Sequence, residues 1–305
     1  MEIFSSPGNI FLFGEHAVVY GRKCIITAIG MRTYCNIEPR EDRKICVFSE
    51  GYGSFELREL REVGEYSNKM DAIKDLIVTY YKKFGIDKGV NITINSEIPK
   101  RSGGMSSSTA VLCSVLKGLS NTFTKIDEKK FYDFLIPFQR KIHGGSASGV
   151  EIFSSTFGGY NLVNIDPVKY ENLGKFKLPI LIVDTGIEAK TSETVPYVRR
   201  GWEQDRKSYE EVFDRIENIV LEGVKAIKNN DLVKLGSLMT ENHNILAKEL
   251  GVSHPKLNKI IDTAIKNGAY GGKLSGGGKG GIAIILTDKN LKFENCYKTD
   301  IGISA

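Results

Sequence analysis

Residues 103–109, with the sequence GGMSSST, form the stretch of this chain that is best suited to chemistry. They follow an apolar run at 90–98 that is typical of a strand, and they precede an apolar run at 110–119 with helical spacing. Small residues at such a turn let backbone N–H groups point outward, and the start of a helix adds about half a positive charge. This combination binds phosphate. Nucleotide chemistry is therefore the first hypothesis.

The serines of this turn could add side-chain ligands. Ser106, Ser107 and Ser108 offer hydroxyls to phosphate oxygens or to Mg²⁺, which prefers oxygen ligands. The alternative is a serine-rich helix cap that binds nothing. The turn alone does not decide between the two.

Two other segments are rich in glycine. In residues 6–21 (SPGNIFLFGEHAVVYG), a strand expected at 9–13 would leave Glu15 and His16 at a cleft, although a lone Glu–His pair is more often structural than catalytic. Five of the nine residues at 273–281 (KLSGGGKGG) are glycine, which costs backbone entropy. Close approach of the backbone to a ligand is the better explanation for them. No GxxxxGK[ST] is present and no GxGxxG opens a first strand–helix unit, so neither a Walker A loop nor a dinucleotide fingerprint is expected.

Strand-like and helical segments alternate along the chain without internal repeats, and the second half is the more helical. We place two domains at 1–168 and 169–305, because charged and turn residues cluster at 165–178. Pro137 should end or kink the helix around it. The expected strands are 25–38, 44–49, 90–98, 158–165, 178–184 and 282–286, and the expected helices are 70–84, 110–120, 129–142, 206–229, 232–250 and 254–267.

The composition fits a soluble globular protein that is long enough for two domains. Of its 305 residues, 41% are apolar and 26% are charged. A net charge of +5 suits an anionic small molecule better than nucleic acid, which usually needs a basic stripe. No apolar run reaches the ~20 residues that span a bilayer, and no secretory signal is evident, so we expect a cytoplasmic protein. Five cysteines without a CxxC pair and only four histidines argue against a zinc site, a disulfide framework and a His-based metal site.

Together, the three glycine-rich segments resemble the motifs of the GHMP kinase family. PGNIFLFGEHAVVYG (7–21) is similar to the first motif of mevalonate kinases, 99–109 matches PxxxGLGSSAA, and 273–281 resembles KxTGAGGGG. The resemblance covers nearly the whole chain. Further segments that resemble archaeal mevalonate kinases are SGVEIFSSTFGG (148–159), DTG (184–186) and LMTENHNILAKELGVS (238–253).

The resemblance implies an α+β, two-domain GHMP kinase fold. The N-terminal domain would resemble domain 2 of ribosomal protein S5, and the C-terminal domain would be ferredoxin-like. ATP and an alcohol would meet in the cleft between them, with Mg²⁺ bound by Ser107, and family membership hints at a homodimer. Glu15, His16, Arg140 and Ser148 would contact the acceptor. The implied ATP-binding residues are Gly103, Gly104, Met105, Ser106, Ser107, Ser108, Gly276, Gly277 and Gly278.

Three positions depart from the family pattern. The family's catalytic lysine corresponds to Asn9, its catalytic aspartate to Glu151 and, in an ungapped alignment, its Mg²⁺-binding glutamate to Arg140. Asn9 and Glu151 are thus the expected catalytic residues, and Glu151 can still orient a hydroxyl or accept its proton. Arg140 could grip a second anion with two hydrogen bonds, and Lys100 and Arg101 could also hold one. One cation would then be lost from the site and another gained elsewhere.

We therefore expect an ATP-dependent kinase of the isoprenoid pathway that acts on mevalonate or on a phosphorylated mevalonate, such as the 3-phosphate or 5-phosphate. Two alternatives stay open. The same fold could phosphorylate a sugar or amino-acid alcohol, which the signature GEHAVVYG disfavours. With the lysine and the aspartate both replaced, the chain could also bind a nucleotide without turnover.

Overall fold

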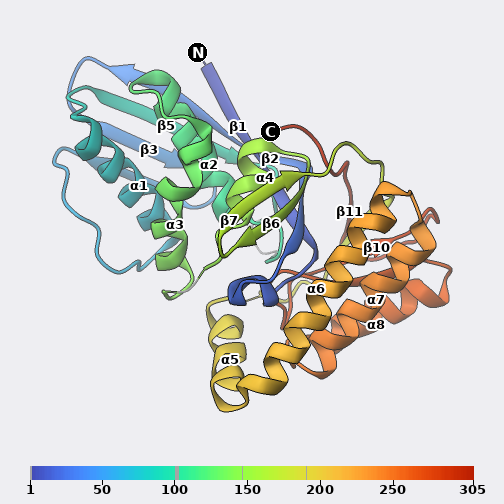
Figure 1. Cartoon of the computed structure of the whole chain (residues 1–305). Helices are drawn as coiled ribbons and strands as arrows, with labels where there is room; N and C mark the ends of the chain where they lie inside the picture. Colours follow the sequence, from blue (N-terminus) through green and yellow to red (C-terminus); the bar gives the residue numbers. More distant parts are fainter. Residues whose placement is uncertain (1, 100–102, 146, 190) are drawn as a thin grey trace.

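The computed structural model describes residues 2–99, 103–145, 147–189 and 191–305. Its strands form a sheet of seven strands and a sheet of four, and helices cover one face of each (Figure 1). The mixed α+β architecture is the one expected. No helix in the described part of the chain is both long enough and apolar enough to cross a bilayer.

The larger sheet is built around one long central strand. β2 (Cys24–Arg40) pairs with β1 (Glu2–Phe13), with β5 (Gly89–Ser96) and with β6 (Tyr160–Ile165). Strands β3 and β4 extend the sheet beyond β5, and β7 extends it beyond β6. The order is β4-β3-β5-β2-β6-β7, and β1 pairs with β2. The remaining strands are β3 (Ile45–Ser49), β4 (Gly53–Leu57) and β7 (Val168–Asn172).

Three of the helices over this sheet begin close to the positions that the sequence predicts. Asn68 caps α1 (Lys69–Phe84) in a reciprocal capping box with Asp71. Pro137 does not end α3 (Phe131–Ile142), because the carbonyl that it leaves without an N–H partner belongs to an exposed turn of the helix. The other elements are α2 (Ser107–Thr122), the short α4 (Glu151–Phe157) and the 3₁₀ turns η1 (Ala17–Tyr20) and η2 (Glu128–Lys130).

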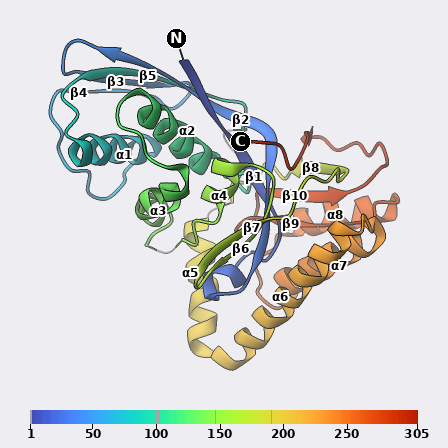
Figure 2. The same cartoon turned by 45° about the horizontal axis from the view of Figure 1, so that its top comes forward.

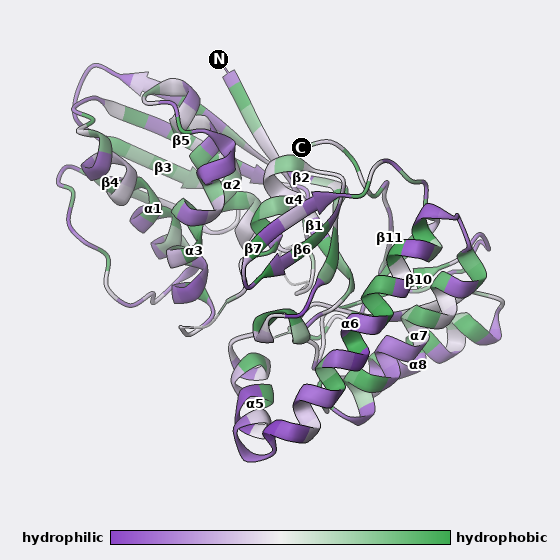
Figure 3. Cartoon of the chain, in the orientation of Figure 1, coloured by the Kyte–Doolittle hydropathy of each residue, from purple (hydrophilic) through white to green (hydrophobic). Residues whose placement is uncertain are grey.

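The smaller sheet is antiparallel throughout, in the order β11-β8-β10-β9. Its strands are β8 (Ile180–Asp184), β9 (Gly271–Ser275), β10 (Ile282–Leu286) and β11 (Cys296–Lys298). Hydrophilic and hydrophobic residues alternate along the helices that cover it, so each presents one apolar stripe (Figure 3). These helices are α6 (Arg206–Lys228), α7 (Leu232–Lys248) and α8 (Pro255–Lys266), preceded by α5 (Thr191–Gln204).

One continuous core joins the two sheets. β1 runs from the larger sheet toward the smaller one (Figure 2). Its residues Ile10, Leu12 and Phe13 belong to the same buried cluster as the strands of the smaller sheet and the helices over it. The chain then returns after β11, where Ile301 bridges to Ile29 of β2. The domain boundary at 168/169 stays a prediction; it falls in the first residues of β7.

Candidate active site

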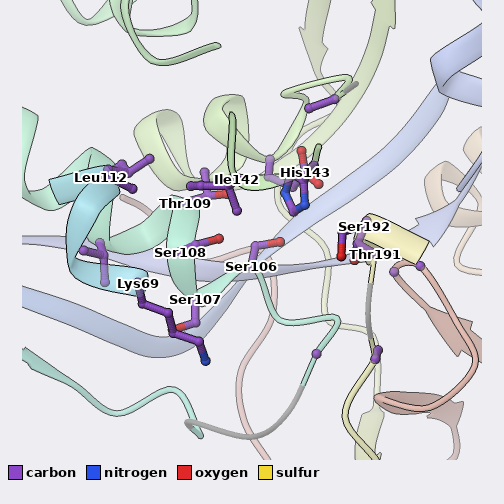
Figure 4. Close-up of a pocket in the computed structure, with 18 of the residues that line it drawn as sticks. Lys69, Ser106, Ser107, Ser108, Thr109, Leu112, Ile142, His143, Thr191 and Ser192 are labelled. Atoms are coloured by element: carbon purple, nitrogen blue, oxygen red, sulfur yellow. The ribbon is translucent and has the colours of Figure 1, made fainter. Parts of the chain in front are cut away.

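A cavity of about 550 Å³ lies where the two sheets meet. Its wall is assembled from distant parts of the chain: the turn after β1, the first turns of α1, α2 and α4, the end of α3, and the start of α5 (Figure 4). The loop after β9 completes it with Gly276 and Gly277. All three glycine-rich segments of the sequence therefore contribute to one cavity.

The turn before α2 has the geometry of an anion site. Ser106 caps the helix in a left-handed conformation (φ 54°), and its carbonyl accepts the first helical bond, from Ala110 N at 3.0 Å. The N–H groups of the first turn consequently have no partner inside the helix. The side chain of Ser106 points toward Thr191 and Ser192 (Figure 4). Ser106, Ser107 and Ser108 all line the cavity.

Glycine lets two of the three segments touch. Gly104 has φ +97°, and a Cβ atom there would lie 2.4 Å from the carbonyl oxygen of Ser275. A Cβ atom on Gly276 would lie 2.8 Å from Cα of Gly104. The turn before α2 can therefore pack against the end of β9 only because these positions lack side chains.

Two of the predicted ATP-binding residues do not line the cavity. Met105 is fully buried in the core, and its carbonyl accepts a hydrogen bond from Asn9 N at 3.2 Å. Gly278 packs against the backbone of Val252, whose oxygen would lie 2.0 Å from an added Cβ atom. Both residues therefore lie behind the lining residues and support them. Gly103, Gly104, Gly276 and Gly277 line the cavity itself.

Glu151 is the acidic side chain that the first turn of α4 brings to the cavity. Burial raises the pKa of its carboxyl. Asn9 lies beneath it, fully buried, and donates to the Glu151 carbonyl at 3.2 Å and to Ser155 Oγ at 3.0 Å. Asn9 is absent from the described lining residues, so its side chain supports α4 instead of facing a ligand.

The Glu15–His16 pair follows β1 and also lines the cavity. Nε2 of His16 lies 3.1 Å from the carbonyl oxygen of Gly277, which can only accept, so this nitrogen carries the proton. Burial, with a smaller contribution from the charge of Lys273, lowers the pKa of His16 to about 4. The imidazole is therefore neutral at pH 7, and its Nδ1 can accept a hydrogen bond.

The structure places Arg140 away from the cavity, although the sequence predicts that it contacts the acceptor. Its side chain is exposed near the end of α3 and is not among the described residues that line the cavity. Successive helical residues are turned by about 100°, so the neighbours of Arg140 face other directions. Gln139 is buried, and its Nε2 donates to Thr109 Oγ1 at 2.9 Å. Lys141 lines the cavity, and its Nζ pairs with Asp75 Oδ2 at 2.6 Å. Ser148 does line the cavity, as expected. Lys100 and Arg101 lie outside the described residues.

Several lining residues were not singled out from the sequence. Lys69 opens α1, directly after the cap of that helix, and the capping pattern SNKMD was the available signal. Glu188, Thr191 and Ser192 follow the DTG segment, which gave no chemical signal of its own. Lys273, which pairs with Glu15, lies behind the lining residues, and the sequence indicates no role for it beyond its place in the glycine-rich segment.

The residues fit a magnesium–nucleotide complex. The described chain contains no group of three or more His, Cys, Asp or Glu side chains that could hold a metal alone. Mg²⁺ seldom needs one, because it typically takes one or two protein oxygens and completes its shell with substrate phosphates and water. The hydroxyl of Ser107 and the carboxylates of Glu151 and Glu188 line the same cavity.

Comparisons with known proteins agree with this arrangement. Models of the N-terminal domain of GHMP kinases and of the C-terminal domain of GHMP kinases match residues 71–159 and 224–296. The mevalonate kinase of Pyrococcus abyssi is 30% identical over 94% of this chain and 88% of its own length. The crystal structure of Methanococcus jannaschii mevalonate kinase is 26% identical, with a TM-score of 0.79 over 97% of this chain and 98% of that one. That of L. major mevalonate kinase in complex with R-mevalonate is 23% identical, with a TM-score of 0.80 over 100% and 97%.

The chain therefore belongs to the GHMP kinase family and has the GHMP kinase fold. It is a phosphotransferase with an alcohol group as acceptor, and membership of this family implies ATP as the phosphate donor.

Proposed function

We propose that this protein transfers the γ-phosphate of ATP to a hydroxyl of mevalonate or of a phosphorylated mevalonate, a step of isoprenoid synthesis. The observation that carries the proposal is one cavity that contains the N-terminus of α2, the carboxylate of Glu151 and the Glu15–His16 pair. Relatives that match more than nine tenths of this chain at 30% identity are mevalonate kinases.

The turn before α2 binds the phosphates of ATP in this proposal. Its unpaired N–H groups and the helix dipole favour a polyanion, and Gly276 and Gly277 close the opposite side. Ser107, together with a carboxylate of the cavity, would hold Mg²⁺, which would neutralise charge on the phosphates.

Glu151 acts on the acceptor. Phosphoryl transfer depends mainly on positioning and charge neutralisation, and the protein has little covalent chemistry to perform. A half-buried carboxylate can orient the acceptor hydroxyl and take its proton as the phosphate arrives. The raised pKa of Glu151 makes it a better base than an exposed glutamate once it is ionised.

Unmodified mevalonate is the first acceptor to test. The hypothesis of a second phosphate rests on Asn9, Arg140 and Glu151 together; of these, the side chain of Arg140 is exposed, and no arginine is among the described lining residues. Asn9 does not replace that charge, because it is neutral and buried. A phosphorylated acceptor remains the second candidate, since the family's lysine and aspartate are both changed in this chain.

The test is ADP release with ATP and Mg²⁺ in the presence of mevalonate, mevalonate 3-phosphate or mevalonate 5-phosphate, each at a range of concentrations. We expect the highest kcat/KM with mevalonate. A higher value with either phosphate ester would select the second candidate. ATP binding without acceptor-dependent ADP release, or a higher kcat/KM with galactose or homoserine, would contradict the proposal.

A further inference from the structure

A buried lysine connects the two sheets behind the cavity. Lys273 of β9 is completely inaccessible to solvent, and its Nζ forms an ion pair with Oε1 of Glu15, which follows β1. The same nitrogen donates to the carbonyl of Leu274 at 2.6 Å. A charge is rarely buried so completely without a partner. Lys273 itself is not among the described residues that line the cavity, so its contact with the site is Glu15.

One oxygen of Glu15 makes no hydrogen bond within the described structure, although the backbone N–H groups of Glu15 and Gly276 lie close enough to the carboxylate to lower its pKa. Its Oε2 is buried, and no described group donates a hydrogen bond to it. Glu15 also lines the cavity, next to His16. Leaving a buried carboxylate oxygen unpaired is unfavourable. A hydroxyl of a bound ligand would supply the missing donor.

The titratable groups around this pair are neutral. From α7, Nδ1 of His243 accepts from Leu274 N at 3.4 Å and Nε2 lies 3.1 Å from Asn258 Oδ1, while burial lowers the pKa of His243 to about 4. His16 is neutral for the same reason. Burial raises the pKa of the Cys24 thiol well above its usual value. Lys273 is therefore the counter-charge of Glu15.

We infer that Lys273 is a positioning residue of the phosphoryl transfer: it fixes the carboxylate of Glu15 at the acceptor end of the cavity and leaves one oxygen free for a hydroxyl of the acceptor. The identity of the acceptor rests on the proposed function, whereas the pairing rests on the geometry alone. Lys273 acts across 258 positions of sequence, through the contact between β9 and the end of β1.

The variant Lys273→Met tests this role. Without its counter-charge, the buried Glu15 has a higher pKa, because the charge of Lys273 and its hydrogen bond both lower it. We expect the KM for the acceptor to rise roughly 10- to 100-fold at pH 7, as for loss of a hydrogen bond to a charged group. The pH below which acceptor binding weakens should move upward by at least about one unit, while the KM for ATP stays within about twofold.

Lys279→Met is the matched control, since Lys279 lies in the same glycine-rich segment, is exposed and packs over the ring of Tyr197. It should leave both KM values and the pH profile unchanged. If Lys273→Met folds and keeps the wild-type acceptor KM and pH profile, the inference is wrong.

A stability cycle separates this inference from the proposed function. Urea unfolding of Glu15→Gln, Lys273→Met and the double variant should show that each single change destabilises the protein more than the double change, because each leaves one buried charge alone. Additive effects would overturn the inference. If the wild-type protein phosphorylates none of the three mevalonates, the proposed function fails, and the cycle still decides whether Lys273 holds the charge of Glu15.

Discussion

The side-chain amide of Asn9 donates a hydrogen bond of 3.2 Å to the main-chain carbonyl of Glu151. The same amide donates to Ser155 Oγ, which in turn donates to the carbonyl of Pro7 at 2.9 Å. β1 and α4 are thus joined by a short buried chain of hydrogen bonds. The orientation of the acidic residue in the cavity depends on a neutral residue beneath it.

Replacement of Asn9 should therefore cost both stability and rate. Asn9→Ala leaves the oxygens of Glu151 and Ser155 without a donor, and we expect a loss of about 1–3 kcal/mol in the free energy of unfolding. A fall in kcat should accompany it, because the start of α4 is released. Urea unfolding and steady-state kinetics measure the two effects. Asn121→Ala, on the exposed end of α2, is the control and should change stability by less than about 0.5 kcal/mol; an equally small effect at Asn9 would contradict this role.

Glu151→Gln should lower kcat by about two to four orders of magnitude while ATP affinity is retained. Burial raises the pKa of Glu151, and a general base works only when it is deprotonated. The kcat of the wild-type protein should therefore rise with pH through a midpoint above 4.5, the ordinary value for glutamate. This acidic limb should be absent from the residual activity of Glu151→Gln. If the acidic limb persists in Glu151→Gln, it belongs to another group. Glu211→Gln, on the exposed face of α6, is the control and should behave as wild type.

Gly104→Ala should disrupt the nucleotide site. The new Cβ atom would lie 2.4 Å from the oxygen of Ser275, so either the turn or the end of β9 must move. Gly144→Ala is a matched control, because Gly144 also has a positive φ (+70°) but no atom lies within 4 Å of its added Cβ. The control should show only the backbone strain of about 1–2 kcal/mol. ATP binding by calorimetry should be lost or strongly weakened in Gly104→Ala alone; equal affinities would show that the contact is dispensable.

Arg140→Ala should leave the acceptor KM within about twofold of wild type, because an exposed side chain away from the cavity contributes little to binding. This outcome is the opposite of what the ungapped alignment implies. A tenfold or larger increase in KM for any of the three mevalonates, with unchanged stability, would show that Arg140 reaches the substrate after all.

The sequence predicted most of the regular elements because their patterns are long and local. Helices α1, α2, α3, α6, α7 and α8 and strands β2, β3, β5, β6, β8 and β10 lie where periodicity placed them, to within a few residues. α4 was missed because it has only seven residues and is buried on several sides. α5 was missed because it is polar and contains Pro196.

The site was predictable where backbone geometry defines it and less so where packing does. The turn before α2 follows from its small residues and its place between a strand and a helix. Which of Gln139, Arg140 and Lys141 faces inward depends on the rotation of α3, which an alignment without gaps does not determine. The pairing of Glu15 with Lys273 joins two sheets, and no local pattern announces it.

The contact between Gly104 and the end of β9 has a mechanical consequence. The turn before α2 belongs to the larger sheet and the loop after β9 to the smaller one. Any hinge motion that separates the two sheets would therefore also separate the two halves of the proposed nucleotide site. Bound ATP should therefore stabilise the arrangement in which the two sheets are in contact, because a ligand stabilises the state that binds it. Saturating nucleotide should slow amide hydrogen exchange at the seam between the sheets more than at their outer edges.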